Sequence, residues 1–122
     1  MSDAIFSLAL WRGLTPQHEW KYGFPTSFHA NLHIEGIETY DGERHGIMEY
    51  TAGVFTGKWD SNDNRIFTGD IVTLEEDENS RKYSVVYEDQ CFYLTVDNTY
   101  ICLGDTFSGD LKIVGNIYEP KV

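Results

Sequence analysis

Turn-forming residues recur at short intervals along this chain, so the secondary-structure elements between them must be short. Clusters of Gly, Asn and Asp bound segments rich in β-branched and aromatic residues, a pattern typical of strands. Helical periodicity is weak, and sequential short strands with tight connections favour an antiparallel sheet over an α/β fold. The sequence therefore predicts an all-β fold, a small antiparallel barrel-like domain with at most one or two short helices, located before residue 32.

The strand pattern is clearest in the C-terminal half. Polar turns are predicted at residues 60–64, 75–79 and 88–90. Asp97-Asn98 is a two-residue connection of the type that favours a tight hairpin. The predicted strands between and after these turns cover residues 69–74, 82–87, 91–96, 99–103 and 111–118.

The N-terminal half gives a weaker pattern. Residues 4–11 fit a strand or a short apolar helix equally well, because periodicity does not separate the two in so short a segment. Residues 13–31 mix Gly, Pro and His with aromatic residues and predict a loop with local turns. Asp41-Gly42 predicts a hairpin turn between strands at 32–40 and 47–55. The aromatic residues expected to pack the loop down are Trp20, Tyr22, Phe24 and Phe28.

The length of 122 residues favours one domain with one core. The apolar segment Leu8 to Trp11 is far shorter than the roughly 20 residues that span a bilayer, and Met-Ser-Asp is not the basic start of a signal peptide. A cytoplasmic protein is therefore expected. Cys91 and Cys102, in segments that look like buried strands, are expected to be free thiols in a reducing compartment.

The charge is strongly negative. The chain carries 20 acidic and 9 basic residues, a formal net charge of −11. Between residues 60 and 110 there are 12 acidic residues against Arg65, Arg81 and Lys82. Direct binding to nucleic-acid phosphates is disfavoured, because clustered cations provide most of that affinity. The charge serves either solubility or recognition of a basic partner.

Three stretches of the C-terminal two thirds together resemble a known pattern. The first runs from Phe55-Thr56-Gly57, through a polar turn with Asp60, Asn62 and Asn64, to Ile66-Phe67-Thr68-Gly69-Asp70-Ile71-Val72. The second combines Val85-Val86-Tyr87 with Cys91-Phe92-Tyr93-Leu94, and the third is Ile113-Val114-Gly115-Asn116-Ile117-Tyr118-Glu119. In this order and spacing, residues 55–119 resemble the YopX family of phage and prophage proteins.

The resemblance implies a mostly β fold and a mobile-element origin, and together with the chain length it predicts one YopX-like β domain over residues 1–122. The N-terminal third, about residues 1–46, departs from the family pattern: only Ile5, Phe6, Ala9 and Trp11 are similar to its opening strand. The family supplies no catalytic residues to transfer. On their own chemistry, Gly57, Gly69, Asp60, Asn62 and Asp70 are expected to hold turns.

No motif predicts catalysis, a metal or a cofactor. Asp60, Asn62 and Asn64 imitate the start of a calcium-binding EF-hand loop, but Arg65 and Ile71 replace the required Gly and Glu. His29 and His33 have the spacing of a helical zinc pair, without a helical apolar pattern around them. Acidic neighbours of Cys91 would raise its pKa rather than activate it. The sequence therefore predicts a non-enzyme without a cofactor.

Three functional hypotheses stay open. The first is a protein-interaction module that binds a host protein with a basic surface, such as a nuclease or defence factor. Its acidic site would be Glu75, Glu76, Asp77 and Glu78, since four adjacent like charges are unfavourable in a hairpin built for stability alone. The second is a barrel that binds a small ligand or single-stranded nucleic acid by stacking on Phe92, Tyr93 and Tyr100, although no Lys or Arg adjoins them. The third is a structural homo-oligomer that pairs C-terminal strand edges.

Overall fold

The computed structural model describes residues 9–26, 28–29, 33–48, 51–74, 81–106 and 110–118. These residues form antiparallel strands and a short 3-10 helix, η2 (Leu103–Asp105), which confirms the all-β fold class. Before residue 32 the described residues contain no helix. The chain divides into two compact units, Met1–Phe55 and Thr56–Val122, each described separately below. The single domain over residues 1–122 stays a prediction.

The first unit contains an antiparallel sheet and a separate small strand pair, β3 and β4, which lies between β2 and β5 in the sequence. Its strands follow the order β6-β5-β2-β1, and β1 also pairs with the start of β7 through Trp11 and Val54. β3 and β4 pair separately. The buried apolar residues of this unit are Trp11, Leu14, Ile34, Ile37, Ile47 and Val54. The strands are β1 (Trp11–Leu14), β2 (Trp20–Pro25), β3 (Phe28–His29), β4 (His33–Ile34), β5 (Gly36–Glu38) and β6 (Arg44–Gly46), followed by β7 (Gly53–Trp59).

The loop predicted for residues 13–31 is wrong. β1 and β2 pair across a tight turn, with Leu14 opposite Trp20. Tyr22 and Phe24 do not pack down, because they lie on the solvent side of β2 with 47% and 40% of their surface exposed. Residues 4–8 lie outside the described residues, so the alternatives of strand or helix there stay open. The aromatic residues of this segment therefore form a strand.

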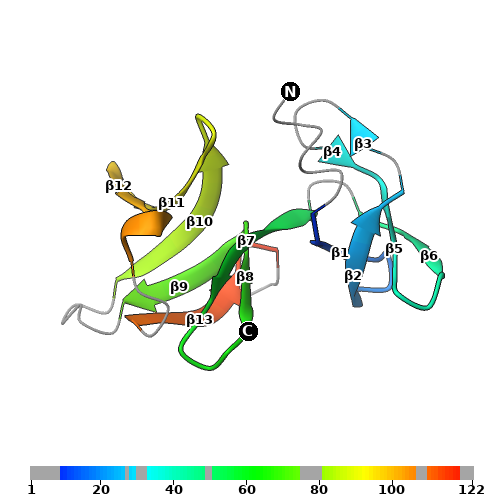
Figure 1. Ribbon diagram of the computed structural model, residues 1–122, viewed down its shortest axis with the longest axis horizontal. Helices are drawn as coiled ribbons and strands as arrows, with labels where there is room; N and C mark the ends of the chain where they lie inside the picture. The colour runs from blue at the N-terminus through cyan, green and yellow to red at the C-terminus, as the bar shows by residue number, and fades with distance from the viewer. Residues whose placement is uncertain are drawn as a thin grey trace. The chain divides into compact units, whose positions relative to one another are not determined.

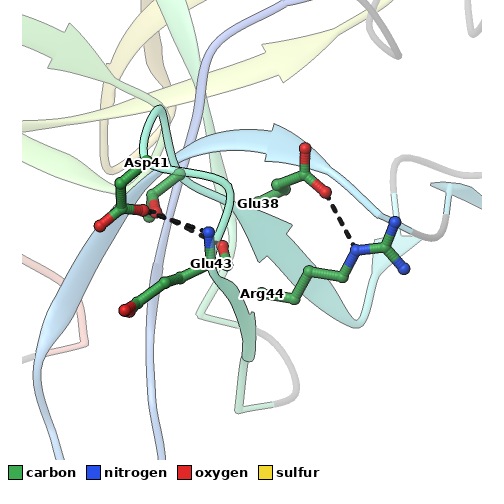
Figure 2. Close-up of polar contacts among 5 residues, drawn as sticks. Glu38, Asp41, Glu43 and Arg44 are labelled. Carbon is green, nitrogen blue, oxygen red and sulfur yellow. Dashed lines mark hydrogen bonds and ion pairs between the residues drawn. The ribbon is translucent and has the colours of Figure 1, made fainter.

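The Asp41-Gly42 turn is confirmed, but the strand that follows it is β6 (Arg44–Gly46), not residues 47–55. Gly42 has the positive φ, 85°, that the turn requires. The Asp41 carboxylate accepts a hydrogen bond from the Thr39 hydroxyl and one of 3.1 Å from the Glu43 N–H, and Glu38 pairs with Arg44 at 3.0 Å (Figure 2). The Thr39 bond is the main cause that lowers the pKa of Asp41. These contacts fix an exposed turn.

The second unit is an open five-stranded antiparallel sheet of order β12-β11-β10-β9-β13, in which β9 lies between β10 and β13 (Figure 1). The remainder of β7 and the neighbouring β8 belong to the same unit. Its core contains Ile66, Val72, Tyr83, Val85, Leu94, Leu103 and Leu111. The strands are β8 (Arg65–Phe67), β9 (Asp70–Leu74), β10 (Lys82–Glu88), β11 (Cys91–Val96), β12 (Thr99–Cys102) and β13 (Leu111–Asn116).

The barrel-like closure expected from the sequence is not formed by the described strands, since β12 and β13 end the sheet without pairing to each other. The chain turns out of β12 directly into η2, and Leu103 enters the core there with 2% exposure. The Leu103 side chain, rather than a further strand pair, thus contributes to the core after β12. The predicted strands of this half are otherwise confirmed within two residues, and β8 was missed.

Candidate interaction surface

The acidic segment Glu75 to Glu78 lies outside the described residues. The structure describes the strands on either side of it: β9 ends at Leu74, and β10 begins at Lys82, opposite Thr73. The segment therefore joins two antiparallel partners at one end of the five-stranded sheet.

Strand register places further acidic residues at this same end. β13 runs antiparallel to β9, with Leu111 opposite Leu74, so Asp110 lies at this end. β11 runs antiparallel to β10, with Thr95 opposite Ser84, so the turn with Asp97 also lies there. We call this the acidic end of the sheet. Its described acidic residues are Asp97 and Asp110, the segment Glu75–Glu78 connects β9 to β10 there, and the cations described at the same end are Arg81, Lys82 and Lys112.

The aromatic residues proposed as a stacking surface are divided between the two faces of the sheet. Phe92 packs against the core and contacts Tyr87, with ring centroids 5.1 Å apart. Tyr93 and Tyr100 lie on the opposite face in a T-shaped contact at 5.8 Å. The division follows from strand periodicity, because Leu94 is buried and successive side chains alternate. A three-ring platform is therefore not formed.

Two lysines missed by sequence reasoning share the face of Tyr93 and Tyr100. Lys82 and Lys112 are both exposed, and each lies opposite Thr73, one on β10 and the other on β13. They are 30 positions apart in sequence, so only the register of three strands reveals that they are neighbours. This face therefore combines two tyrosines with two cations.

Both cysteines are free, as expected, but Cys91 is exposed and Cys102 half-buried, so the expectation that they are core residues is wrong. They share the outward face with Tyr93, since Cys102 lies opposite Tyr93 and Cys91 precedes it by two residues. The electrostatic interaction with Cys91 is the main cause that raises the pKa of Tyr93, and the side-chain hydrogen bond between the two residues adds to it. Tyr93 is therefore an uncharged phenol at neutral pH.

Asp60 holds the scaffold of the second unit. It is buried, and its carboxylate accepts hydrogen bonds from the backbone N–H groups of Asn62 and Asn64, each at 2.9 Å, and of Ile113 at 3.1 Å. Burial raises the pKa of Asp60, but these hydrogen bonds outweigh burial and lower it overall. The carboxylate is therefore committed to the turn rather than to a metal.

Of the other residues predicted to hold turns, Asp70 and Gly69 lie in a turn and Gly57 does not. Asp70 accepts a 2.8 Å bond from the Phe67 N–H, which confirms its role in the turn before β9. Gly69 has φ 94°, and a Cβ there would lie 2.6 Å from the Tyr118 ring. Gly57 also has a positive φ, 87°, but it lies inside β7 rather than at a strand end. Gly69 and Asp70 therefore serve the structure of the turn before β9, where Gly69 leaves room for the Tyr118 ring.

The histidine pair has strand geometry. His29 and His33 are opposite residues of the β3–β4 pair, not neighbours on a helix. Within the part of the chain that the structure describes, no group of three or more His, Cys, Asp or Glu side chains has metal-binding geometry.

Comparison with known proteins places this scaffold in a family. The model of the family described as YopX protein matches residues 15–121. The chain belongs to the YopX family. The match begins well before residue 55, so the YopX pattern includes most of the N-terminal third that looked atypical by sequence. Membership indicates a phage-type protein. No curated protein matches the chain. In the described residues, no helix has the length and apolar character needed to cross a membrane.

Proposed function

We propose that this YopX protein is a non-enzymatic interaction module that binds a basic surface of a host protein. The partner class is one with a cationic nucleic-acid channel, such as a nuclease or a defence protein, which the bound module would inhibit in the host cytoplasm. The proposal rests on one observation: strand register gathers Asp97 and Asp110 at the end of the sheet where the segment Glu75–Glu78 connects β9 to β10.

The negative charge of this arrangement would speed association with a basic partner. An excess of negative over positive charge at one end of a small protein produces a field that steers a basic partner and raises the on-rate, with strong salt dependence. The formal charge of −11 reinforces the field.

The hydrogen bonds of the buried carboxylates support a non-enzymatic role. Among the described residues, Asp60 and Asp70 are the buried acidic side chains, and both accept hydrogen bonds from backbone N–H groups. The hydrogen bonds of Asp60 lower its pKa, so its carboxylate is an anion rather than a general acid near neutral pH. Both aspartates serve the turns of the second unit.

The test compares two triple variants with equal changes of charge. Glu75→Gln, Glu76→Gln and Glu78→Gln alter the acidic segment, whereas Glu19→Gln, Glu35→Gln and Glu43→Gln remove three exposed carboxylates from the first unit. Host lysate is passed over the wild-type protein at low and high salt, and association with the recovered partner is timed.

The expected partner is basic and is lost at high salt. The acidic-segment variant should associate about tenfold more slowly with a flatter salt dependence, as expected for steering charges, and the first-unit variant should change little. Recovery of acidic proteins alone, or equal on-rates for both variants, contradicts the proposal.

One observation favours a second candidate, binding of single-stranded nucleic acid. Tyr93 and Tyr100 provide rings on the face that also carries Lys82 and Lys112, the combination of stacking and cations that such binding uses. Titration with short oligonucleotides at low salt, followed by tyrosine fluorescence, tests it. Quenching that Lys82→Gln with Lys112→Gln abolishes would support it, and absence of quenching at low salt removes it.

A further inference from the structure

β12 (Thr99–Cys102) is an open edge of the five-stranded sheet. It pairs with β11 along one side, and no other described strand pairs with it. The N–H and C=O groups along the outer side of an edge strand can pair with an added strand, and proteins usually protect such edges with charge, bulges or covering contacts.

The opposite edge has all three kinds of protection. β13 carries the charged Lys112, and its register shifts between Ile113 and Gly115. The Asp60 carboxylate accepts the Ile113 N–H at 3.1 Å, and the Ser61 N–H binds the Leu111 carbonyl at 2.8 Å. β12 has no charged residue, and its register with β11 is regular over all four positions. The sheet therefore protects one edge and leaves the other suited to pairing.

The register indicates which groups of β12 face outward. Val96 and Thr99 flank a two-residue turn and form its closing pair. Hydrogen-bonded and non-hydrogen-bonded pairs alternate in an antiparallel ladder, so the backbone groups of Tyr100 and Cys102 point away from β11. The Tyr100 side chain is 52% exposed and stands against Tyr93, so an aromatic surface adjoins this edge.

Charge at the two ends of β12 selects the occupant. Asp97 precedes the strand and Asp105 follows it, and both are exposed. A second copy of the chain is disfavoured, because antiparallel self-pairing about the middle of β12 brings Asp97 of one copy toward Asp105 of the other. A cationic strand meets opposite charge at both ends instead.

We propose that β12 binds an extended cationic segment of the partner as an added strand. The segment would have about four uncharged residues, the length of β12 at roughly 3.3 Å per residue, flanked on both sides by Lys or Arg. This inference rests on the proposed function for the basic character of the partner, and it assigns the strand that the partner contacts.

Amide hydrogen exchange measured by NMR tests the assignment. The probe is the peptide Lys-Lys-Thr-Val-Thr-Val-Lys-Lys, and its counterpart has Glu at all four Lys positions. The Ile101 amide should already be protected in the free protein. The basic peptide should slow exchange at Tyr100 and Cys102 by about tenfold or more, and the acidic peptide should not. Protection elsewhere, equal effects of both peptides, or protection that rises with protein concentration alone overturns the proposal.

Two substitutions distinguish the contribution of the Tyr100 backbone to peptide binding from that of its side chain. Tyr100→Pro removes the outward N–H and should abolish peptide binding, whereas Tyr100→Val keeps the N–H and should weaken binding only partly. If Tyr100→Pro does not fold, the exchange measurement on the wild-type protein decides alone. Peptide protection at β12 together with an unchanged on-rate of the acidic-segment variant contradicts only the proposed function. A slowed variant without protection at β12 contradicts only the assignment.

Discussion

A single buried carboxylate links distant parts of the second unit. One oxygen of Asp60 binds the N–H groups of Asn62 and Asn64 in its own turn, and the other binds the N–H of Ile113 on β13, 53 positions later in sequence. Hydrogen bonds to a charged acceptor are roughly twice as strong as neutral ones. The aspartate of the family motif therefore stabilises tertiary structure as well as a local turn.

We predict that Asp60→Asn lowers the free energy of unfolding by about 2–4 kcal/mol, because the amide loses the charge and one acceptor oxygen. The neighbouring Asp63 is exposed and has φ 62°, a conformation that Asn tolerates well. Asp63→Asn is therefore the matched control and should change stability by under about 0.5 kcal/mol. Urea denaturation of the three proteins measures both effects, and equal losses would contradict the role of Asp60.

The lowered pKa of Asp60 also predicts acid sensitivity. The folded-state pKa lies below the ordinary value of 3.8, so the stabilisation is fully present above that value and is lost as the pH falls through the folded pKa. The unfolding free energy of the wild-type protein should therefore fall more steeply between about pH 5 and pH 2 than that of Asp60→Asn. Urea titrations across this range check it, and parallel pH profiles would be the contrary result.

At the scale of elements, the β10–β11 hairpin contains a strained connection. Asp89 and Gln90 have φ of 49° and 66°, so both turn residues occupy the left-handed region. Turns of this type fit the twist of paired strands but favour Gly at the second position. Gln90 therefore keeps an unfavourable backbone conformation within an otherwise regular hairpin.

We predict that Gln90→Gly stabilises the protein by about 0.5–1 kcal/mol, because Gly adopts positive φ without a Cβ clash. Gln90→Ala retains the Cβ and is the control, for which no gain is expected. Thermal unfolding compares the three proteins. A gain for Ala equal to that for Gly would mean that the side chain, rather than the backbone, is responsible.

The elements of the second unit could be predicted from sequence because alternation and turn chemistry agree there. Residues 91–96 alternate about the buried Leu94, and Asp97-Asn98 ends them as expected. β2 could not be predicted, because Gly, Pro and His are mixed with the aromatic residues of its segment. The structure gives one of these glycines another role: a Cβ on Gly23 would lie 2.1 Å from the Glu38 carbonyl oxygen on β5. A glycine required for close strand approach looks the same in sequence as one required for a turn.

The candidate surface, like β2, could be predicted only in part from the sequence. The acidic segment 75–78 is visible in the sequence as adjacent charges. That Asp97 and Asp110 lie at the same end of the sheet follows only from the pairing of β11 with β10 and of β13 with β9. The open edge at β12 likewise requires the strand order, which local patterns do not contain.

At the scale of the whole molecule, β7 belongs to both compact units. Its first residues pair with β1 in the first unit, and the remainder continues beside β8 in the second. Loss of either unit removes hydrogen bonds from the same strand. We expect this shared strand to couple the unfolding of the two units.

We therefore predict one calorimetric transition, with a van't Hoff enthalpy equal to the calorimetric enthalpy. Val54→Asp, which places a charge at a buried position of β7 in the first unit, should lower the midpoint of the whole transition. Two separate transitions, with only one shifted by Val54→Asp, would show that the units unfold independently. Tyr40→Asp, at a position 87% exposed in the same unit, is the control.

The position of β9 between β10 and β13 has a consequence for synthesis on the ribosome. β10 follows β9 closely along the chain, whereas β13 supplies the other neighbour only after residues 111–116 have been translated. Until then the nascent chain holds a central strand with one unpaired side, and the carboxylate of Asp60 lacks its bond to Ile113. Pairing over such sequence separations is slow and leaves strand edges open to misassociation. The sheet is thus completed at the β13 edge, and until residues 111–116 are available the unpaired side of β9 is exposed to misassociation.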